Sequence, residues 1–417
     1  MTENTTVSRR QYNERFKEIL AQLNPSQRYA VDNIDGPVLT IAGPGTGKTH
    51  ILAARIGQIL IQTDTQPHNV LCLTYTDAGV NAMRRRLLEF IGPEAHRIHI
   101  FTFHSFCNKV IQENLDIFGY NELQLVSDLE RIDIIRQIID GLDPTHPIKI
   151  HNRRSPYRFE GKLINLFSRM KTEGWDAKYI SKQLDEYIAS LPQNKEFCYK
   201  VNGKGYKKGD LNLNKYKPEV QKMEELRAAA FLFDEYDHLM HEAGRYDYDD
   251  MILWVMRAFS NPENEHVLRR YQEQYLYILV DEFQDTNGAQ SKILHNLISY
   301  WEQPNIFIVG DDDQSIYEFQ GARVKNMIDF FHQYEEHLTL VILKENYRSG
   351  QQILDAAKQV IDRNEIRIIR QLANLKVDKN LVAANLDLNP SKIELHIRSY
   401  PKRVQEEVDI VQQIKVL

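Results

Sequence analysis

Short hydrophobic runs, each followed by a turn and a helical pattern, recur through the first hundred residues of the chain. They cover residues 38–42, 69–74 and 97–102. Strands that alternate with helices in this way are typical of a parallel sheet covered by helices. The pattern therefore predicts an α/β fold for this part of the chain.

The pattern changes to a mostly helical one between residues 115 and 243. Helices are expected at residues 129–139, 162–170, 177–189 and 218–241, with a loop rich in glycine, lysine and asparagine at 193–215. Strand patterns return at residues 275–280, 305–309 and 338–343. We therefore expect the helical block to be inserted into the α/β domain. A helix at 352–362, a strand at 392–398 and a C-terminal helix are expected to begin a further domain.

Composition restricts the class of protein. Hydrophobic residues make up 42% and charged residues 26% of 417 residues, and no apolar run approaches the roughly 20 residues of a membrane span. The polar first ten residues do not resemble a secretory signal. Cys72, Cys107 and Cys198 lie too far apart to form a zinc knuckle or an iron–sulfur cluster by themselves, which favours a reducing compartment. We expect a soluble, cytoplasmic protein.

Charge is unevenly distributed along the chain. The net charge is −6, but residues 149–222 contain 17 lysines and arginines against 8 acidic residues. Tyrosine, phenylalanine and tryptophan are interspersed there, and basic residues mixed with aromatic ones suit a sugar–phosphate chain with stackable bases. A solvated helical face explains the composition equally well.

A glycine-rich segment lies between a strand pattern and a helical pattern. Residues 43–49 read Gly-Pro-Gly-Thr-Gly-Lys-Thr, and Ala42 stands where such loops usually begin with glycine. This pattern is typical of a phosphate-binding loop, in which backbone amides and lysine hold phosphates and the last hydroxyl contacts Mg²⁺. The residues expected to bind a nucleoside triphosphate are Gly43, Gly45, Thr46, Gly47, Lys48 and Thr49.

The strand pattern at 275–280 ends in Asp281 and Glu282. Beside a phosphate loop, two such acids have separate roles: Asp281 is expected to hold Mg²⁺, and Glu282 to polarise the attacking water as a base. Without the phosphate loop, a solvated acidic pair would be the better interpretation.

Another strand pattern leads into Gly-Asp-Asp-Asp-Gln at 310–314. A neutral amide at Gln314, placed beside the γ-phosphate, can report through its hydrogen bonds whether that phosphate is present. Tyr317 and Phe319 follow in a polar context, which favours at least one exposed ring.

Seven segments together resemble the UvrD/Rep/PcrA-type superfamily 1 DNA helicases. In order they cover residues 23–27, 42–49, 73–76, 102–106, 281–287, 309–322 and 346–349. The resemblance implies a RecA-like P-loop NTPase core with an inserted helical accessory domain. The implied domains are residues 1–114 and 244–337 for the first core, 115–243 for the accessory domain, and 338–417 for an incomplete second core.

The resemblance also implies roles for individual residues. Gln27 would read the adenine edge, Tyr347 would pack on the base, and Arg348 would reach the γ-phosphate, so that ATP with Mg²⁺ is the expected cofactor. Phe319 stands where the family usually has a base-stacking tryptophan, and Gln320 where relatives often carry arginine. The residues implied to contact DNA are Tyr75, Thr76, Thr102, His104, Tyr317 and Phe319.

The implied function is an ATP-dependent DNA helicase that moves 3′ to 5′ along single-stranded DNA, coupling ATP hydrolysis to duplex unwinding in DNA repair or replication. Nothing in the 417 residues resembles the family's later motifs. Two alternatives therefore stay open: a nucleotide-gated DNA-binding module deficient in turnover, and the motor part of a helicase–nuclease. A small-molecule kinase is disfavoured because residues 281–285 and 310–314 have no role there.

Overall fold

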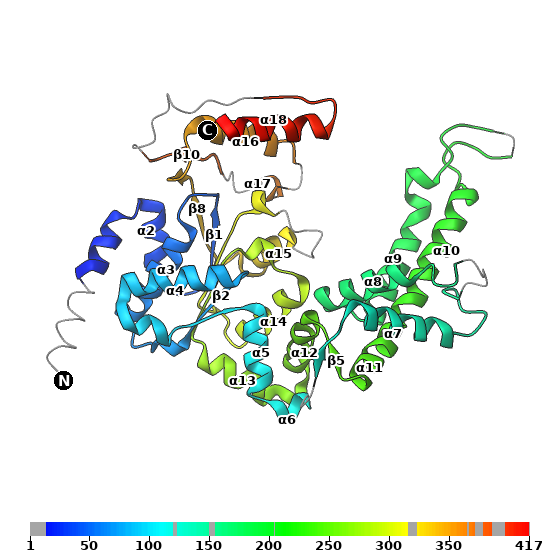
Figure 1. The fold of residues 1–417 in the computed structure, drawn as a ribbon, viewed down its shortest axis with the longest axis horizontal. Coiled ribbons are helices and arrows are strands. Elements are labelled where there is room, and N and C mark those ends of the chain that lie inside the picture. The colour runs from blue at the N-terminus through cyan, green and yellow to red at the C-terminus, as the bar shows by residue number, and fades with distance from the viewer. Residues whose placement is uncertain are drawn as a thin grey trace.

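A six-stranded parallel sheet forms the centre of the computed structural model (Figure 1). The structure describes residues 14–119, 123–149, 155–203, 205–315, 323–364, 367–371, 378–385 and 397–416. The strands are β1 (Val38–Ala42), β2 (Val70–Thr74), β3 (His99–Thr102), β6 (Tyr277–Val280), β7 (Ile306–Gly310) and β8 (Thr339–Leu343). Their order is β3-β2-β6-β7-β1-β8. The predicted α/β class and its six strand positions are confirmed.

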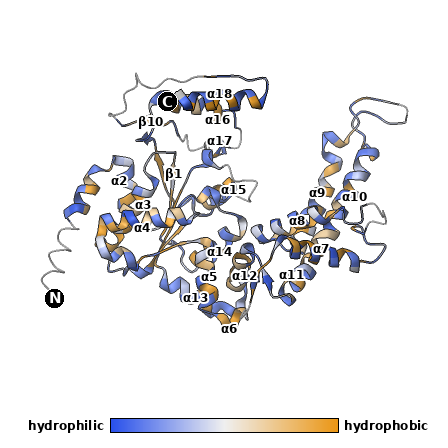
Figure 2. Ribbon diagram, in the orientation of Figure 1, coloured by the Kyte–Doolittle hydropathy of each residue, from blue (hydrophilic) through white to orange (hydrophobic). Residues whose placement is uncertain are grey.

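Successive residues of the strands face opposite sides of the sheet, and helices cover both sides. Val38 and Cys72 pack in one buried cluster, whereas Leu39 and Leu71 pack in the other. The hydrophobic strands appear in orange in Figure 2. The first cluster includes α2 (Pro25–Asp32), α3 (Lys48–Gln62) and α4 (Asp77–Ile91). The second includes α5 (Phe103–Gln112), α12 (Tyr248–Ser260), α13 (Glu265–Gln274), α14 (Gly288–Ile298) and α15 (Val324–Tyr334).

The helical block projects to one side of the sheet (Figure 1). Its entry and exit lie together, because β4 (Gln124–Leu125) pairs in parallel with β5 (Arg245–Tyr246). The chain thus leaves the core and returns at one place, as an insertion requires. The short helix α6 (Leu115–Phe118) precedes β4 and lies next to α5 at the core (Figure 1). The helices that project are α7 (Asp128–Gly141), α8 (Glu160–Glu173), α9 (Ala177–Ser190), α10 (Leu213–Ala230) and α11 (Phe233–Glu242).

One helix prediction is wrong. The single helix expected at 218–241 is two helices, because α10 ends at Ala230 and α11 starts at Phe233. The break directs Phe233 and Tyr236 into the core, where both rings pack against Phe167 of α8. Burial of these rings therefore outweighs the continuous helical pattern.

The C-terminal part of the chain begins inside the first sheet. β8 pairs in parallel with β1, with Val38 opposite Thr339, so residues 339–343 belong to the central sheet. The domain boundary expected at 338 stays a prediction. Next come β9 (Glu345–Asn346), α16 (Gln351–Ile361), α17 (Ile368–Gln371), β10 (Val382–Ala383) and α18 (Arg403–Val416). Residues 392–396 of the strand expected at 392–398 lie outside the described residues. Among the described helices, none is both long and apolar enough to span a bilayer.

A buried lysine joins the insertion to the core. Lys171 of α8 is 1% exposed, and its Nζ lies 2.7 Å from Asp250 Oδ1 and 2.9 Å from Asp247 Oδ2 at the start of α12. Burial acts to lower the pKa of Lys171, but the charges of Asp250 and Asp247 outweigh it and raise the pKa above its usual value. Lys171 therefore stays charged and fixes α8 on α12.

We predict that Lys171→Ala lowers the free energy of unfolding by about 3–5 kcal/mol, because it leaves the buried carboxylate of Asp250 without the cation that contacts it. Lys222→Ala is the matched control, since its side chain is 68% exposed and its pair with Glu219 spans one helical turn. That control should change the free energy by less than about 0.5 kcal/mol. Urea unfolding measures both, and equal effects would contradict the role given to Lys171.

Candidate functional site

The predicted phosphate loop connects β1 to α3. Gly45 and Gly47 have φ angles of +71° and +88°, a conformation that costs glycine little, and Gly47 caps α3, which begins at Lys48. The first amides of a helix have no carbonyl of that helix to bind, and the helix dipole adds positive potential there. The loop therefore has the backbone shape and the charge that a phosphate group requires.

Side chains hold this loop in shape from within and from α2. Thr46 donates its hydroxyl to the carbonyl oxygen of Gly43 at 2.7 Å. Gln27, which is 5% exposed, donates its amide to the carbonyl oxygen of Thr46 at 2.9 Å and accepts from the backbone amide of Asn24 at 3.2 Å. Gln27 thus lies at the phosphate loop as expected, and its contact with adenine stays a prediction.

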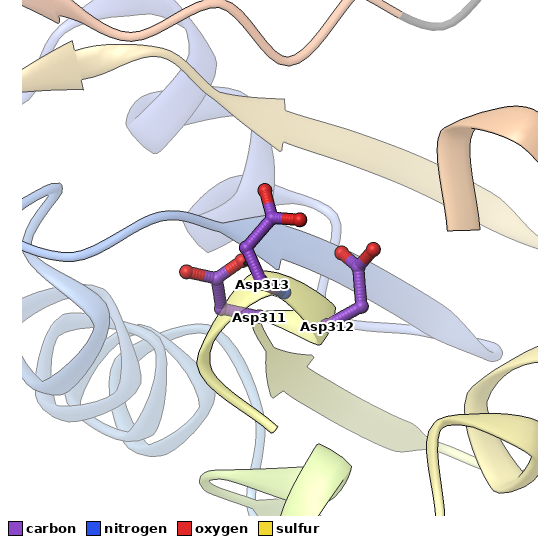
Figure 3. A group of neighbouring side chains, drawn as sticks. All are labelled: Asp311, Asp312 and Asp313. Atoms are coloured by element: carbon purple, nitrogen blue, oxygen red, sulfur yellow. Dashed lines mark hydrogen bonds between the residues drawn. The ribbon is translucent and has the colours of Figure 1, made fainter. Parts of the chain in front are cut away.

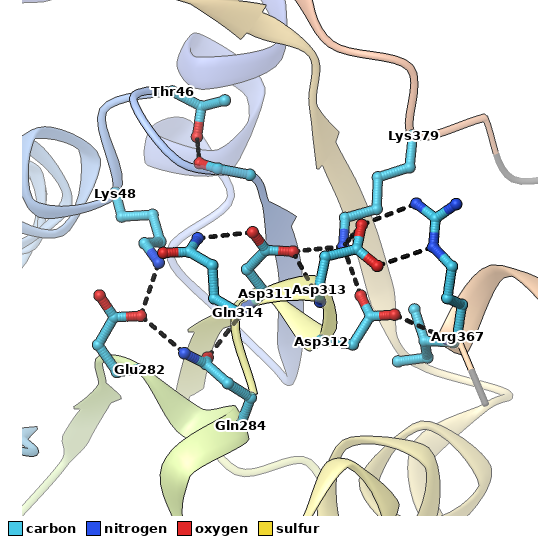
Figure 4. Close-up of polar contacts among 12 residues, drawn as sticks. Thr46, Lys48, Glu282, Gln284, Asp311, Asp312, Asp313, Gln314, Arg367 and Lys379 are labelled. Atoms are coloured by element: carbon cyan, nitrogen blue, oxygen red, sulfur yellow. Dashed lines mark hydrogen bonds and ion pairs between the residues drawn. The ribbon is translucent and has the colours of Figure 1, made fainter. Parts of the chain in front are cut away.

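Lys48 and Glu282 meet across the site. Lys48 Nζ lies 2.6 Å from Glu282 Oε2, and the same oxygen accepts a hydrogen bond from Gln284 Nε2 at 3.0 Å (Figure 4). Glu282 has a φ of +48°, the only positive φ among the described non-glycine residues. Such strain is common at functional sites, and here it turns the carboxylate after β6 toward the phosphate loop.

Asp281 provides a buried carboxylate beside this pair. Burial and the charge of Glu282 raise the pKa of Asp281 to about 7, against the opposing effect of Lys48. Thr49 lies in the first turn of α3, half-buried. A carboxylate and a hydroxyl are oxygen ligands of the kind Mg²⁺ takes, and its charge would keep Asp281 ionised. These residues therefore fit a Mg²⁺ ion bound together with phosphates.

Gln314 joins the same network from the end of β7. Its Nε2 donates to Asp311 Oδ2 at 2.6 Å, while the backbone amide of Asp311 donates to Gln284 Oε1 at 2.9 Å. Gln284 therefore connects Glu282 to the loop that carries Gln314 (Figure 4). No role was expected for Gln284, although it lies within the acidic segment that follows β6.

The segment after β8 lies directly on the phosphate loop. The backbone amide of Tyr347 donates to the carbonyl oxygen of Gly45 at 2.9 Å, and Asn346 Nδ2 donates to that of Pro44 at 2.5 Å. A Cβ atom on Gly45 would lie 2.7 Å from Arg348 Cβ, so only glycine allows this approach. Tyr347 and the exposed Arg348 are thereby placed beside the loop, about 300 residues along the chain from it.

The residues expected to line a DNA path follow neighbouring strands. Thr76 caps α4 by accepting from the amide of Gly79 at 3.0 Å, and Thr102 caps α5 by accepting from that of Ser105 at 3.1 Å. The ring of His104 packs edge-on against Tyr248 at 6.1 Å, and burial lowers the pKa of His104. The structure thus gives these side chains structural contacts at the edge where β2 and β3 end.

Tyr75, which directly follows β2, is partly buried. Tyr317, Phe319 and Gln320 lie outside the described residues. Contact of Tyr75, Thr76, Thr102 and His104 with DNA therefore stays a prediction.

The family can now be assigned by comparison. A family model described as the UvrD/REP helicase N-terminal domain matches residues 23–335. The chain belongs to the UvrD/REP helicase family. This match confirms the family resemblance and, together with the parallel sheet, the RecA-like fold.

Two relatives of this UvrD/REP family member carry the same name. The chain is 31% identical over 354 residues to the ATP-dependent DNA helicase PcrA of Bacillus subtilis. It is 30% identical over 353 residues to the ATP-dependent DNA helicase PcrA of Staphylococcus aureus strain Mu50. Each match covers 84% of this chain and 41% of the relative. The chain thus spans less than half the length of these relatives.

We predict that Lys48→Ala weakens the binding of Mg·ATP about 10- to 100-fold, the loss expected when a charged hydrogen-bond donor to phosphate is removed. Titration with a fluorescent ATP analogue measures the affinity. Lys17→Ala, whose side chain is 72% exposed, should leave it unchanged. An unchanged affinity in Lys48→Ala would refute the phosphate-loop assignment.

Proposed function

We propose that this chain is the nucleotide-driven part of a DNA motor. It binds ATP with Mg²⁺ at the phosphate loop and hydrolyses ATP when single-stranded DNA is bound. It moves 3′ to 5′ and unwinds duplex DNA during repair or replication in the cytoplasm. The observation that carries the proposal is the convergence of Lys48, Glu282, Gln314 and Arg348, which come from four separate segments, around one phosphate loop.

The geometry supports a division of roles among these residues. Lys48 exchanges its partner Glu282 for the phosphates of ATP, because an ammonium neutralises their charge. Glu282 then orients the attacking water and accepts its proton, while Gln284 continues to hold the carboxylate by one oxygen. Asp281 and Thr49 would hold Mg²⁺, which would supply positive charge to the phosphate oxygens.

Gln314 and Arg348 connect this site to the segments that we expect to move when ATP is hydrolysed. Gln314 is hydrogen-bonded to Asp311, so a change at the γ-phosphate would reach the loop that leads to Tyr317 and Phe319. Arg348 adds positive charge near the γ-phosphate only when its segment lies on the phosphate loop. These two residues would therefore make hydrolysis depend on the arrangement of the surrounding segments.

The inserted domain supports the nucleic-acid part of the proposal. Its loop between α9 and α10 extends far from the sheet (Figure 1) and exposes Lys207 and Lys208. The rings of Tyr199 and Tyr206 stack at 3.7 Å within this loop. Exposed lysines beside aromatic rings can bind phosphates and bases without sequence preference.

We predict that Glu282→Gln keeps the affinity for Mg·ATP but slows hydrolysis in the presence of single-stranded DNA about 10²- to 10⁴-fold, the usual contribution of a general base. A single-turnover assay with radiolabelled ATP measures the chemical step. Glu263→Gln, at an exposed position, is the matched control and should hydrolyse ATP normally. Equal rates in Glu282→Gln and the unaltered chain would refute the role of Glu282.

We predict that replacing Lys207, Lys208 and Lys204, the last of which lies outside the described residues, by glutamine flattens the salt dependence of single-stranded DNA binding. Each lost phosphate contact should reduce the slope of log K against log salt by about 0.7, or roughly 2 for all three. Fluorescence anisotropy with a labelled oligonucleotide measures the slope. The control is Lys17→Gln, Lys344→Gln and Lys358→Gln, three lysines outside this loop. If the slope stays the same in the first variant, these lysines only solvate the loop.

A further inference from the structure

Three consecutive carboxylates follow β7. One carboxylate oxygen from each of Asp311, Asp312 and Asp313 lies within 4.8 Å of the other two, and the side chains of Asp311 and Asp312 are at most 1% exposed (Figure 3). Like charges held this close out of water repel each other strongly. The arrangement is stable only if cations lie beside it.

The cations come from the C-terminal part of the chain. Lys379 is 2% exposed, and its Nζ contacts Asp311, lies 2.5 Å from Asp312 Oδ1 and 2.9 Å from Asp313 Oδ2. Arg367 binds both oxygens of Asp313 at 2.7 Å through its Nε and Nη2. Among the described residues, Lys379 and Arg367 are thus the side-chain cations that contact the triplet (Figure 4), and Lys379 contacts all three carboxylates.

The electrostatics favour a charged Lys379 in this position. Burial acts to lower its pKa, but the attraction of Asp311, Asp312 and Asp313 outweighs burial and raises the pKa above its usual value. Hydrogen bonds from Arg367 and the charge of Lys379 lower the pKa of Asp313 in spite of its burial. Lys379 and Asp313 thus both stay ionised near neutral pH.

The triplet is continuous with the nucleotide site. Asp311 accepts from Gln314 and donates its backbone amide to Gln284, which donates to Glu282, the partner of Lys48. A set of direct hydrogen bonds and ion pairs therefore runs from the ammonium of Lys379 to that of Lys48 (Figure 4).

The segment that carries Lys379 reaches the phosphate loop by a second route. Two residues further on, the side chain of Leu381 lies so close to Gly43 that a Cβ atom there would be 2.8 Å from Leu381 Cδ2. Val382 and Ala384 donate backbone hydrogen bonds to Lys344 and Asn346. Residues 378–385 are thus anchored on the triplet at one end and lie on the phosphate loop at the other.

We propose that Lys379 is a positioning residue that fastens residues 378–385 to the loop that carries Gln314, so that both respond together when nucleotide binds at the phosphate loop. The proposal rests on the proposed function of that loop as an ATP site. Lys379 itself touches neither the expected nucleotide ligands nor the expected base; it acts through Asp311 and Gln284.

The test compares Lys379→Met with Lys344→Met. Both lysines bind an aspartate at this junction, but the side chain of Lys344 is 40% exposed, and its ion pair in the described part of the chain is with Asp378 at 2.8 Å, so its loss should matter little. A third variant combines Lys379→Met with Asp312→Asn. It removes one of the carboxylates that would be left without Lys379, while the side-chain oxygen of the new asparagine can still accept from the backbone amide of Ile368. This variant separates loss of positioning from general destabilisation.

Hydrogen exchange of the amides in residues 311–315 and 378–385 is the main measurement, made with and without Mg·ATP. In the unaltered chain and in Lys344→Met, Mg·ATP should slow exchange in residues 378–385 at least about tenfold. In both variants without Lys379, that slowing should fall below about twofold. The affinity for Mg·ATP should stay within about threefold, because the phosphate loop itself is unchanged.

Two results would overturn the proposal. The first is that Mg·ATP slows exchange in residues 378–385 as much in Lys379→Met as in the unaltered chain. The second is that this slowing is fully restored in the variant that also carries Asp312→Asn, which would make Lys379 a stabilising residue only. If the unaltered chain does not respond to Mg·ATP, the proposed ATP site fails instead. Hydrogen exchange without nucleotide then still tests whether Lys379 fastens the two segments to each other. If it does, Lys379→Met must speed exchange in both segments at least about tenfold, and Lys344→Met must not.

Discussion

The parallel direction of the central strands is the constraint on which the rest of this structure depends. Because all six strands run the same way, the segments that follow β1, β6 and β7 emerge at one edge of the sheet. Open α/β sheets bind their ligands at this edge. The phosphate loop, the acids after β6 and the Gln314 loop therefore meet although up to about 270 residues separate them. The insertion between β3 and β6 leaves this edge intact, since its two ends pair with each other.

Buried cations hold in place the segments that pack around this sheet. Arg55 of α3 is 1% exposed and donates to the carbonyl oxygens of Ala30 and Ile34, which ties α3 to α2 and the turn after it. Lys171 ties the inserted domain to α12, and Lys379 ties the C-terminal segment to the Gln314 loop. Removing one partner of a buried ion pair lowers the free energy of unfolding by much more than the pair itself adds relative to an apolar contact. The main effect of such cations is therefore to determine which segments pack together, and their contribution to overall stability is smaller.

Local patterns in the sequence predicted the elements well, because a buried strand or a phosphate loop is encoded over a few neighbouring residues. The strand at 38–42 has the predicted limits, whereas the loop expected at 43–49 ends at Gly47, because α3 already begins at Lys48. Pairings between distant segments were not encoded in this way. Nothing in the spacing shows that β8 joins β1, or that Lys379, among 52 lysines and arginines, neutralises the three carboxylates after β7. The break between α10 and α11 likewise depends on which rings the core buries.

The most direct test of this account is the rate of ATP hydrolysis by the 417-residue chain with and without single-stranded DNA, at saturating Mg·ATP. We expect this rate to rise several-fold with a single-stranded oligonucleotide and much less with a blunt duplex of the same length. A rate that is the same under all three conditions would contradict the claim that the nucleotide site and a DNA surface belong to one motor.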